Sequence, residues 1–137
     1  MSAKSSTAPD QMVGAPTDAP ASLAALAKSL ADLDELVALV GRGHPRAKPW
    51  QRLLGNQLFE IDRALQVLRM TMVMERADAE ILAAAEVLCA ECRKARTAIA
   101  SSRSDLTTKA AVRLIVDLAS KVRYDLQLAR DQMPNPL

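Results

Sequence analysis

The chain is poor in aromatic residues, histidine and cysteine. Its 137 residues include one tryptophan, one tyrosine, one phenylalanine, two cysteines and one histidine, His44. Strand-rich folds use β-branched and aromatic residues, whereas Ala, Leu, Arg, Lys, Gln and Glu favour helices, so this composition favours an all-α fold with an aliphatic core. A single histidine excludes a zinc site with several histidine ligands and the paired Glu-x-x-His motifs of dinuclear carboxylate bundles.

Long apolar runs and a strong net charge are also absent. No apolar run approaches the roughly 18 residues of a membrane span, and the start MSAKSST lacks the apolar stretch of a secretory signal. The net charge of +2 is too small to indicate a nucleic-acid or membrane partner by itself. No glycine-rich phosphate-binding loop follows a predicted strand. We therefore expect a cytoplasmic protein that is not an enzyme and has no cofactor.

The two cysteines form a C-x-x-C motif, Cys89-Ala-Glu-Cys92. Redox enzymes place this motif at the start of a helix, where the helix dipole lowers the thiol pKa. Here the pair falls in the middle of a segment with helical spacing, and two thiolates are fewer than the four ligands of a structural zinc site. We interpret both cysteines as buried packing residues and predict no metal site. The alternative is a metal ion shared between two chains.

Residues 1–21 carry three prolines and a glycine among small and polar residues, without a periodic apolar residue. Such a segment cannot offset the entropy cost of ordering its backbone, so we predict a disordered tail. Residues 134–137 contain two prolines and are predicted to be a disordered end. The folded domain is expected to span residues 22–133.

Apolar residues recur at alternating spacings of three and four in four segments, which is typical of amphipathic helices that pack on helices. The first helix is expected from an N-cap at Ser22 to Val40, with Gly41 in the left-handed conformation at its end. The second begins at Pro49, and the fourth follows a cap at Ser104 or Asp105. The four stripes are Leu23, Leu26, Leu30, Leu33, Val37 and Val40; Leu54, Leu58, Ile61, Leu65, Leu68 and Met72; Ile81, Ala85, Leu88, Cys92, Ala95 and Ile99; and Ile115, Leu118, Val122, Leu126 and Ala129.

The spacing loses its phase between Met72 and Ile81, in a stretch that contains neither glycine nor proline. A tight turn near Arg76 to Asp78 explains this slip and predicts an antiparallel four-helix bundle. The alternative is a dimer of three-helix chains in which one long helix runs from about residue 50 to 101. Because helices of that length are rare in compact domains, the sequence favours the turn.

Charges in the last segment alternate in sign every four residues, at Arg113, Asp117, Lys121 and Asp125. Oppositely charged side chains at this spacing stabilise a helix by a few tenths of a kcal/mol per pair. We predict a solvated ladder of ion pairs without a functional site.

Cationic residues are concentrated in two segments that contain no acidic residue. In an up-down-up-down bundle both segments lie at one end, while Glu75, Asp78 and Glu80 mark the other. This predicts a basic pole that binds a small anion or nucleic acid. The alternative explanation is that cations near helix C-termini complement the helix dipole. The predicted anion-binding residues are Arg42, Arg46, Lys48, Arg52, Arg93, Lys94, Arg96 and Arg103.

The end of the second predicted helix is apolar around most of its circumference, which is more than one core-facing stripe requires. Exposed methionines adapt to irregular surfaces and often mark protein interfaces. Complete burial inside the bundle is the alternative. The sequence thus predicts a helical interaction protein, such as an adaptor, chaperone or regulator, whose partner is another protein or a second copy in a homodimer with coiled-coil-like packing. The predicted partner-binding residues are Val67, Met70, Val73 and Met74.

Overall fold

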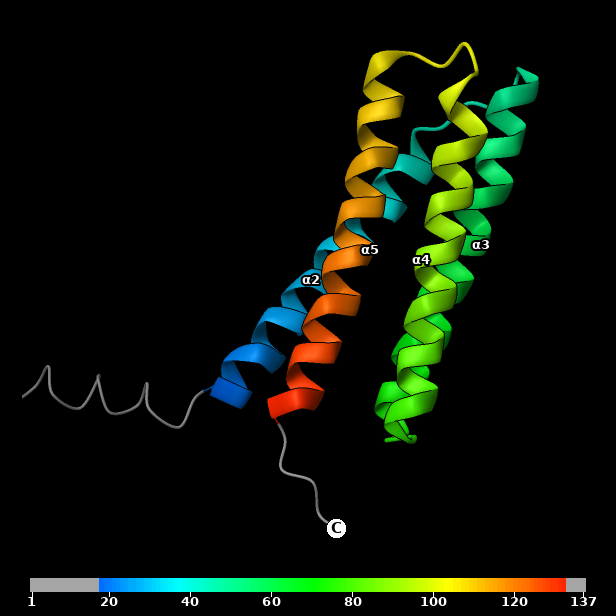
Figure 1. The fold of residues 1–137 in the computed structure, drawn as a ribbon. Coiled ribbons are helices and arrows are strands. Elements are labelled where there is room, and N and C mark those ends of the chain that lie inside the picture. The colour runs from blue at the N-terminus through cyan, green and yellow to red at the C-terminus, as the bar shows by residue number, and fades with distance from the viewer. Residues whose placement is uncertain (1–17, 133–137) are drawn as a thin grey trace, which may run out of the picture.

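The computed structural model describes residues 18–132, which form four helices and no strand. The helices are α2 (Asp18–Arg42), α3 (Pro49–Val73), α4 (Asp78–Ala100) and α5 (Leu106–Gln132). They run alternately up and down (Figure 1), which confirms the predicted antiparallel four-helix bundle. The predicted disordered segments lie outside the described residues, except that residues 18–21 form the first turn of α2.

A short connection, residues 74–77, joins α3 to α4, so the predicted turn is confirmed and the long continuous helix is wrong. Glu75 has a φ of 54°, in the left-handed region that ends helices. The Glu75 N–H donates to the Met72 carbonyl (3.0 Å) and the Arg76 N–H donates to the Thr71 carbonyl (3.0 Å). These two bonds form a Schellman motif with glutamate in the position that glycine usually takes.

Both predicted ends of α2 are wrong. The helix begins at Asp18, four residues before the expected cap at Ser22, and continues through Gly41 to Arg42. Proline is tolerated in the first helical turn because N–H groups there have no helical partner, so Pro20 does not prevent this start. No glycine in the described part of the chain has a positive φ, and Gly41 therefore does not end the helix.

The other helix starts agree with the sequence. Helix α3 begins at Pro49, and the Lys48 N–H before it donates to the Gln51 side-chain oxygen (2.8 Å). Helix α5 follows Asp105, whose carboxylate accepts a hydrogen bond from the Thr108 N–H (3.2 Å). Asp105 is therefore the N-cap residue.

The core is made of Leu, Ile, Val, Ala and Cys side chains. The predicted stripes supply most of it: Leu65 and Leu68 of α3, Leu88 of α4 and Ile115 of α5 are all fully buried. Among residues 18–132 no aromatic side chain is buried, and Trp50 packs against the edge of the core at half burial. The aliphatic core that the composition predicts is confirmed.

The four helices do not pack equally. Helices α3 and α4 form one closely packed pair, α2 and α5 form the other, and α4 joins α5. The contact between α2 and α3 is much the smallest of the four, and the two pairs splay apart toward the end where α2 begins (Figure 1). An ion pair between Arg69 Nη1 and Asp34 Oδ2 (3.4 Å) bridges α3 and α2.

The prediction that the ladder of ion pairs on α5 is solvated is wrong for its last residue, Asp125. Asp125 is buried, accepts a hydrogen bond from the buried Ser29 hydroxyl of α2 (3.0 Å) and pairs with Lys121 (3.0 Å). Residues four apart on a helix are rotated by about 40° from each other, so three such steps turn Asp125 about 120° away from Arg113. This rotation brings Asp125 from the solvated face to the α2 interface.

Candidate functional site

The predicted partner-binding residues are exposed. The exposed fractions of Val67, Met70, Val73 and Met74 are 52%, 57%, 77% and 56%. Leu68, in the same helix, is fully buried in the core. Helix α3 is therefore apolar on the face that packs in the bundle and also on the face that points outward. The alternative of complete burial is wrong for these four residues.

Phe59 belongs to the same outward face, and the sequence analysis did not identify it. Its side chain is 61% exposed, and it lies two helical turns before Val67. Phe59, Arg63, Val67, Met70 and Met74 follow one another at spacings of 4, 4, 3 and 4. This spacing was visible in the sequence and could have revealed Phe59. We call the five exposed apolar residues of this face the α3 stripe: Phe59, Val67, Met70, Val73 and Met74.

Helix α4 adds an exposed apolar residue next to the α3 stripe. A shallow surface groove of about 200 Å³ lies between the outer faces of the two helices. Its apolar part includes Val67 of α3 and the exposed Val87 of α4. Charged side chains of both signs, Glu60, Arg63 and Glu91, line the same groove. The outer face of the α3–α4 pair thus combines an apolar strip with adjacent opposite charges.

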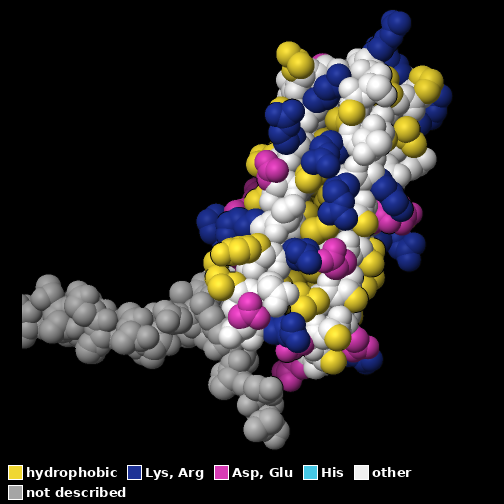
Figure 2. Space-filling model, viewed as in Figure 1, with side chains coloured by type: hydrophobic (Ala, Val, Ile, Leu, Met, Phe, Trp, Pro, Cys, Tyr) yellow, Lys and Arg dark blue, Asp and Glu magenta, His cyan; other side chains and the backbone are white. Residues whose placement is uncertain are grey.

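The structure brings the two basic segments to the same end of the bundle. Lys48, from the connection between α2 and α3, and Arg103, from the connection between α4 and α5, line one cavity of about 500 Å³. On the face drawn in Figure 2, Lys and Arg side chains gather toward the upper end, where these connections lie.

The eight predicted anion-binding residues do not form one cluster, however. The Arg46 guanidinium packs over Gly55, so closely that a Cβ atom there would lie 2.6 Å from Arg46 Nη1. Arg52 donates to the Arg46 and Ala47 carbonyls (3.3 and 2.9 Å).

The remaining cations occupy other surfaces of the basic end. Arg93 and Lys94 line a different surface, next to Gln57 on the α3–α4 face, and Lys94 pairs with Glu91 (3.2 Å). Arg42 and Arg96 are exposed near the C-terminal ends of α2 and α4. Lys48 and Arg103 are therefore the two predicted anion-binding residues that share a cavity.

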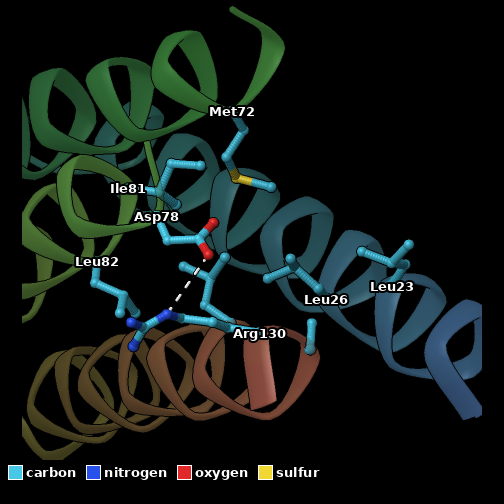
Figure 3. A pocket seen from close by; sticks show the side chains of 9 residues that line it. Leu23, Leu26, Met72, Asp78, Ile81, Leu82 and Arg130 are labelled. Carbon is cyan, nitrogen blue, oxygen red and sulfur yellow. Dashed lines mark ion pairs between the residues drawn. The ribbon is translucent and has the colours of Figure 1, made fainter. Parts of the chain in front are cut away.

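The opposite end of the bundle carries Glu75, Asp78 and Glu80, as predicted. The Arg76 guanidinium, hydrogen-bonded to Glu80 (2.9 Å), holds the pKa of that carboxyl below its usual value. Asp78 pairs with Arg130 (3.5 Å) across an apolar pocket of about 210 Å³ (Figure 3). All four helices contribute to this pocket, including Leu26 of α2. It forms where the two helix pairs splay apart.

Both cysteines are buried and free of disulfide bonds. The Cys89 thiol donates to the Ala119 carbonyl (3.4 Å). Burial raises the pKa of both thiols, and that of Cys92 to about 12. Reactive thiols need a lowered pKa, so the opposite shift supports the interpretation of Cys89 and Cys92 as packing residues.

In residues 18–132 no group of three or more His, Cys, Asp or Glu side chains is arranged to hold a metal ion. None of the described helices combines the length and the apolar character that crossing a bilayer requires. Comparisons with known proteins found no protein family, no curated protein and no solved structure that matches the chain.

Proposed function

We propose that this protein is a non-enzymatic helical interaction protein of the cytoplasm, which self-associates through the α3 stripe. The observation that carries the proposal is the row of exposed Phe, Val and Met side chains on the face of α3 opposite the core. Removing apolar surface from water is favourable by about 25 cal/mol per Å², and contiguous exposed apolar patches commonly mark interfaces. Covering the stripe with a partner therefore lowers the free energy of the system.

A second copy of the chain is the partner that the stripe fits best. Together with Arg63, four of its members (Phe59, Val67, Met70 and Met74) follow one another at spacings of 4, 4, 3 and 4, which are typical of helices that pack side by side with interlocking side chains. A two-fold axis brings the same patch of both copies together, so each stripe would cover the other. Glu60 and Arg63 form an ion pair within one chain (4.0 Å) beside the stripe, and Glu91 lines the same groove, so the margin of the interface carries charges of both signs.

Methionine also suits a surface that accepts more than one partner. Its unbranched side chain adapts to irregular neighbours. Met70 and Met74, both exposed, lie toward the C-terminal end of the stripe. Adaptors and chaperones use such surfaces to bind several helices. We propose that the stripe also binds an amphipathic helix of a client or regulated protein, in competition with the second copy.

The test of self-association is the mass of the protein in solution. The wild-type chain should reach twice its monomer mass of 14.8 kDa in light scattering at micromolar concentration. The double variant Met70→Glu/Met74→Glu should remain a monomer, because two buried like charges per chain would oppose association. Its helical circular dichroism should be unchanged, since both positions are exposed.

Leu114→Glu is the matched control, because Leu114 is a half-exposed apolar residue on α5, outside the stripe. This variant should associate like the wild type. A wild-type monomer at every concentration would contradict the proposal, and so would a double Glu variant that still dimerises.

A further inference from the structure

We infer that the cavity at the basic end of the bundle binds a small anion with a flat ring, an aromatic phosphate or carboxylate. The cavity has a volume of about 500 Å³, within the range of about 300–1,000 Å³ typical of small-molecule sites. It lies between the C-terminal end of α2, the residues that begin α3 and the first turn of α5. The site is separate from the α3 stripe and does not depend on self-association.

Two cations from different connections would hold the anionic group. Lys48 and Arg103 both line the cavity. Within residues 18–132 neither side chain forms an ion pair, whereas Lys28, Arg69, Arg76 and Lys121 all do. Each charge is therefore available to a ligand.

The one carboxylate in the cavity wall is already engaged. Asp105 accepts the N–H of Thr108, and hydrogen bonds from the Thr108 hydroxyl and N–H hold the pKa of Asp105 below its usual value. Its charge is offset by the first turn of α5, where Thr107 and Thr108 line the cavity and the helix dipole is positive. The wall as a whole keeps an excess of positive charge.

Two aromatic residues in the cavity wall suit a flat ring. The rings of Trp50 and His44 contact each other at a centroid distance of 6.0 Å, and both residues line the cavity beside Leu39, Val40 and Pro45. The His44 Nε2 atom lies 2.5 Å from the Gln51 carbonyl oxygen, which fixes the imidazole against α3. A ligand ring would therefore find a stacking surface held in place by the fold.

The indole N–H of Trp50 adds a second, independent observation. It is buried and has no hydrogen-bond acceptor among the described residues. A buried donor without an acceptor destabilises the fold, so a ligand that supplies the acceptor removes this penalty. A phosphate or carboxylate oxygen bound in the cavity would supply this acceptor once the indole turns its N–H toward it.

A single small anion fits these residues better than a nucleic acid does. The Arg46 guanidinium packs over Gly55 of α3, and Arg52 donates to a carbonyl of the connection. Arg93 and Lys94 line a different surface. The cations therefore do not form a continuous track along which a phosphate backbone could lie, and no row of aromatic side chains accompanies them.

Titration of the full chain with phenyl phosphate tests this inference. Trp50 is the only tryptophan, so its fluorescence reports on the cavity directly, and calorimetry gives an independent affinity. Saturable binding of phenyl phosphate is expected, at least tenfold tighter than binding of inorganic phosphate or of phenol. The double variant Lys48→Gln/Arg103→Gln should weaken it at least tenfold, with unchanged circular dichroism.

Lys94→Gln/Arg96→Gln is the control, because it removes the same charge at the same end of the bundle without touching the cavity. This variant should bind phenyl phosphate like the wild type. Three results would overturn the inference: no saturable binding, equal affinity for inorganic phosphate, or equal weakening in the two double variants.

Discussion

Truncation of Leu65 to alanine should lower the free energy of unfolding by about 2–5 kcal/mol. The Leu65 side chain is fully buried in α3 and belongs to the hydrophobic core of the bundle. Truncation removes favourable burial and leaves a cavity that the surrounding aliphatic side chains can fill only in part. A domain of this size is typically stable by only about 5–15 kcal/mol, so this single change would remove a large share of the total.

Leu53→Ala is the matched control for this measurement. Leu53 lies in the same helix, is about half exposed and is not part of the α3 stripe. Alanine has a slightly higher helix propensity than leucine, so Leu53→Ala should change the unfolding free energy by no more than about 0.5 kcal/mol. Urea denaturation followed by circular dichroism gives both values. Equal effects of the two substitutions would mean that the assignment of the core face is wrong.

Raising the pH above 9 should destabilise the fold through Cys92. Burial raises the pKa of this thiol from its ordinary value of 9.0 to about 12. Between these two values the unfolded chain releases the thiol proton while the folded chain keeps it, so stability falls as the pH rises. The loss from this thiol is about 1.4 kcal/mol per pH unit, or roughly 4 kcal/mol over the whole interval, and it vanishes below pH 9.

Unfolding free energies at pH 8, 9 and 10, measured for the wild type and for Cys92→Ala, isolate this contribution. Other groups titrate in the same range and affect both proteins, so the difference between the two curves is the relevant quantity. The wild type should lose more stability than the variant between pH 9 and 10, by about 1 kcal/mol. Parallel curves would show that the Cys92 thiol is not buried in the folded protein.

The sequence predicted the helices and their order because the apolar spacing is a local property of each segment. It also predicted the turn between α3 and α4, through the loss of phase between Met72 and Ile81. The residue that forms this turn could not be foreseen, because Glu75 adopts a left-handed conformation that glycine or asparagine usually takes. Gly41 was predicted to end α2 in a left-handed conformation. A glycine also fits a right-handed helix, and α2 continues through it.

Long-range contacts account for the other differences. From the local sequence, Asp125 is expected in an exposed ladder. In the structure it accepts a hydrogen bond from Ser29, which is 96 residues away in the chain. The sequence also predicted that the basic segments meet at one end, but it could not tell which cations face a shared cavity. The path of the first connection decides this, because it places Arg46 over Gly55 and leaves Lys48 at the cavity.

The α3 stripe was predicted in part, from the unusual run of methionine and valine near the end of the helix. Phe59 was missed because it lies outside that run, eight residues before Val67. The core-facing stripe of α3 was predicted correctly, and Phe59 lies with Val67 and Met70 on the opposite, exposed face.

The most direct test of self-association through this stripe is a charge-swap mixing experiment. One variant carries Met70→Glu/Met74→Glu and the other carries Met70→Lys/Met74→Lys. If two α3 stripes face each other, each variant alone should be a monomer of 14.8 kDa in sedimentation velocity, and an equimolar mixture should form a heterodimer of twice that mass. A mixture that stays monomeric while the wild type dimerises would contradict the account, because the two stripes would then not meet across the interface.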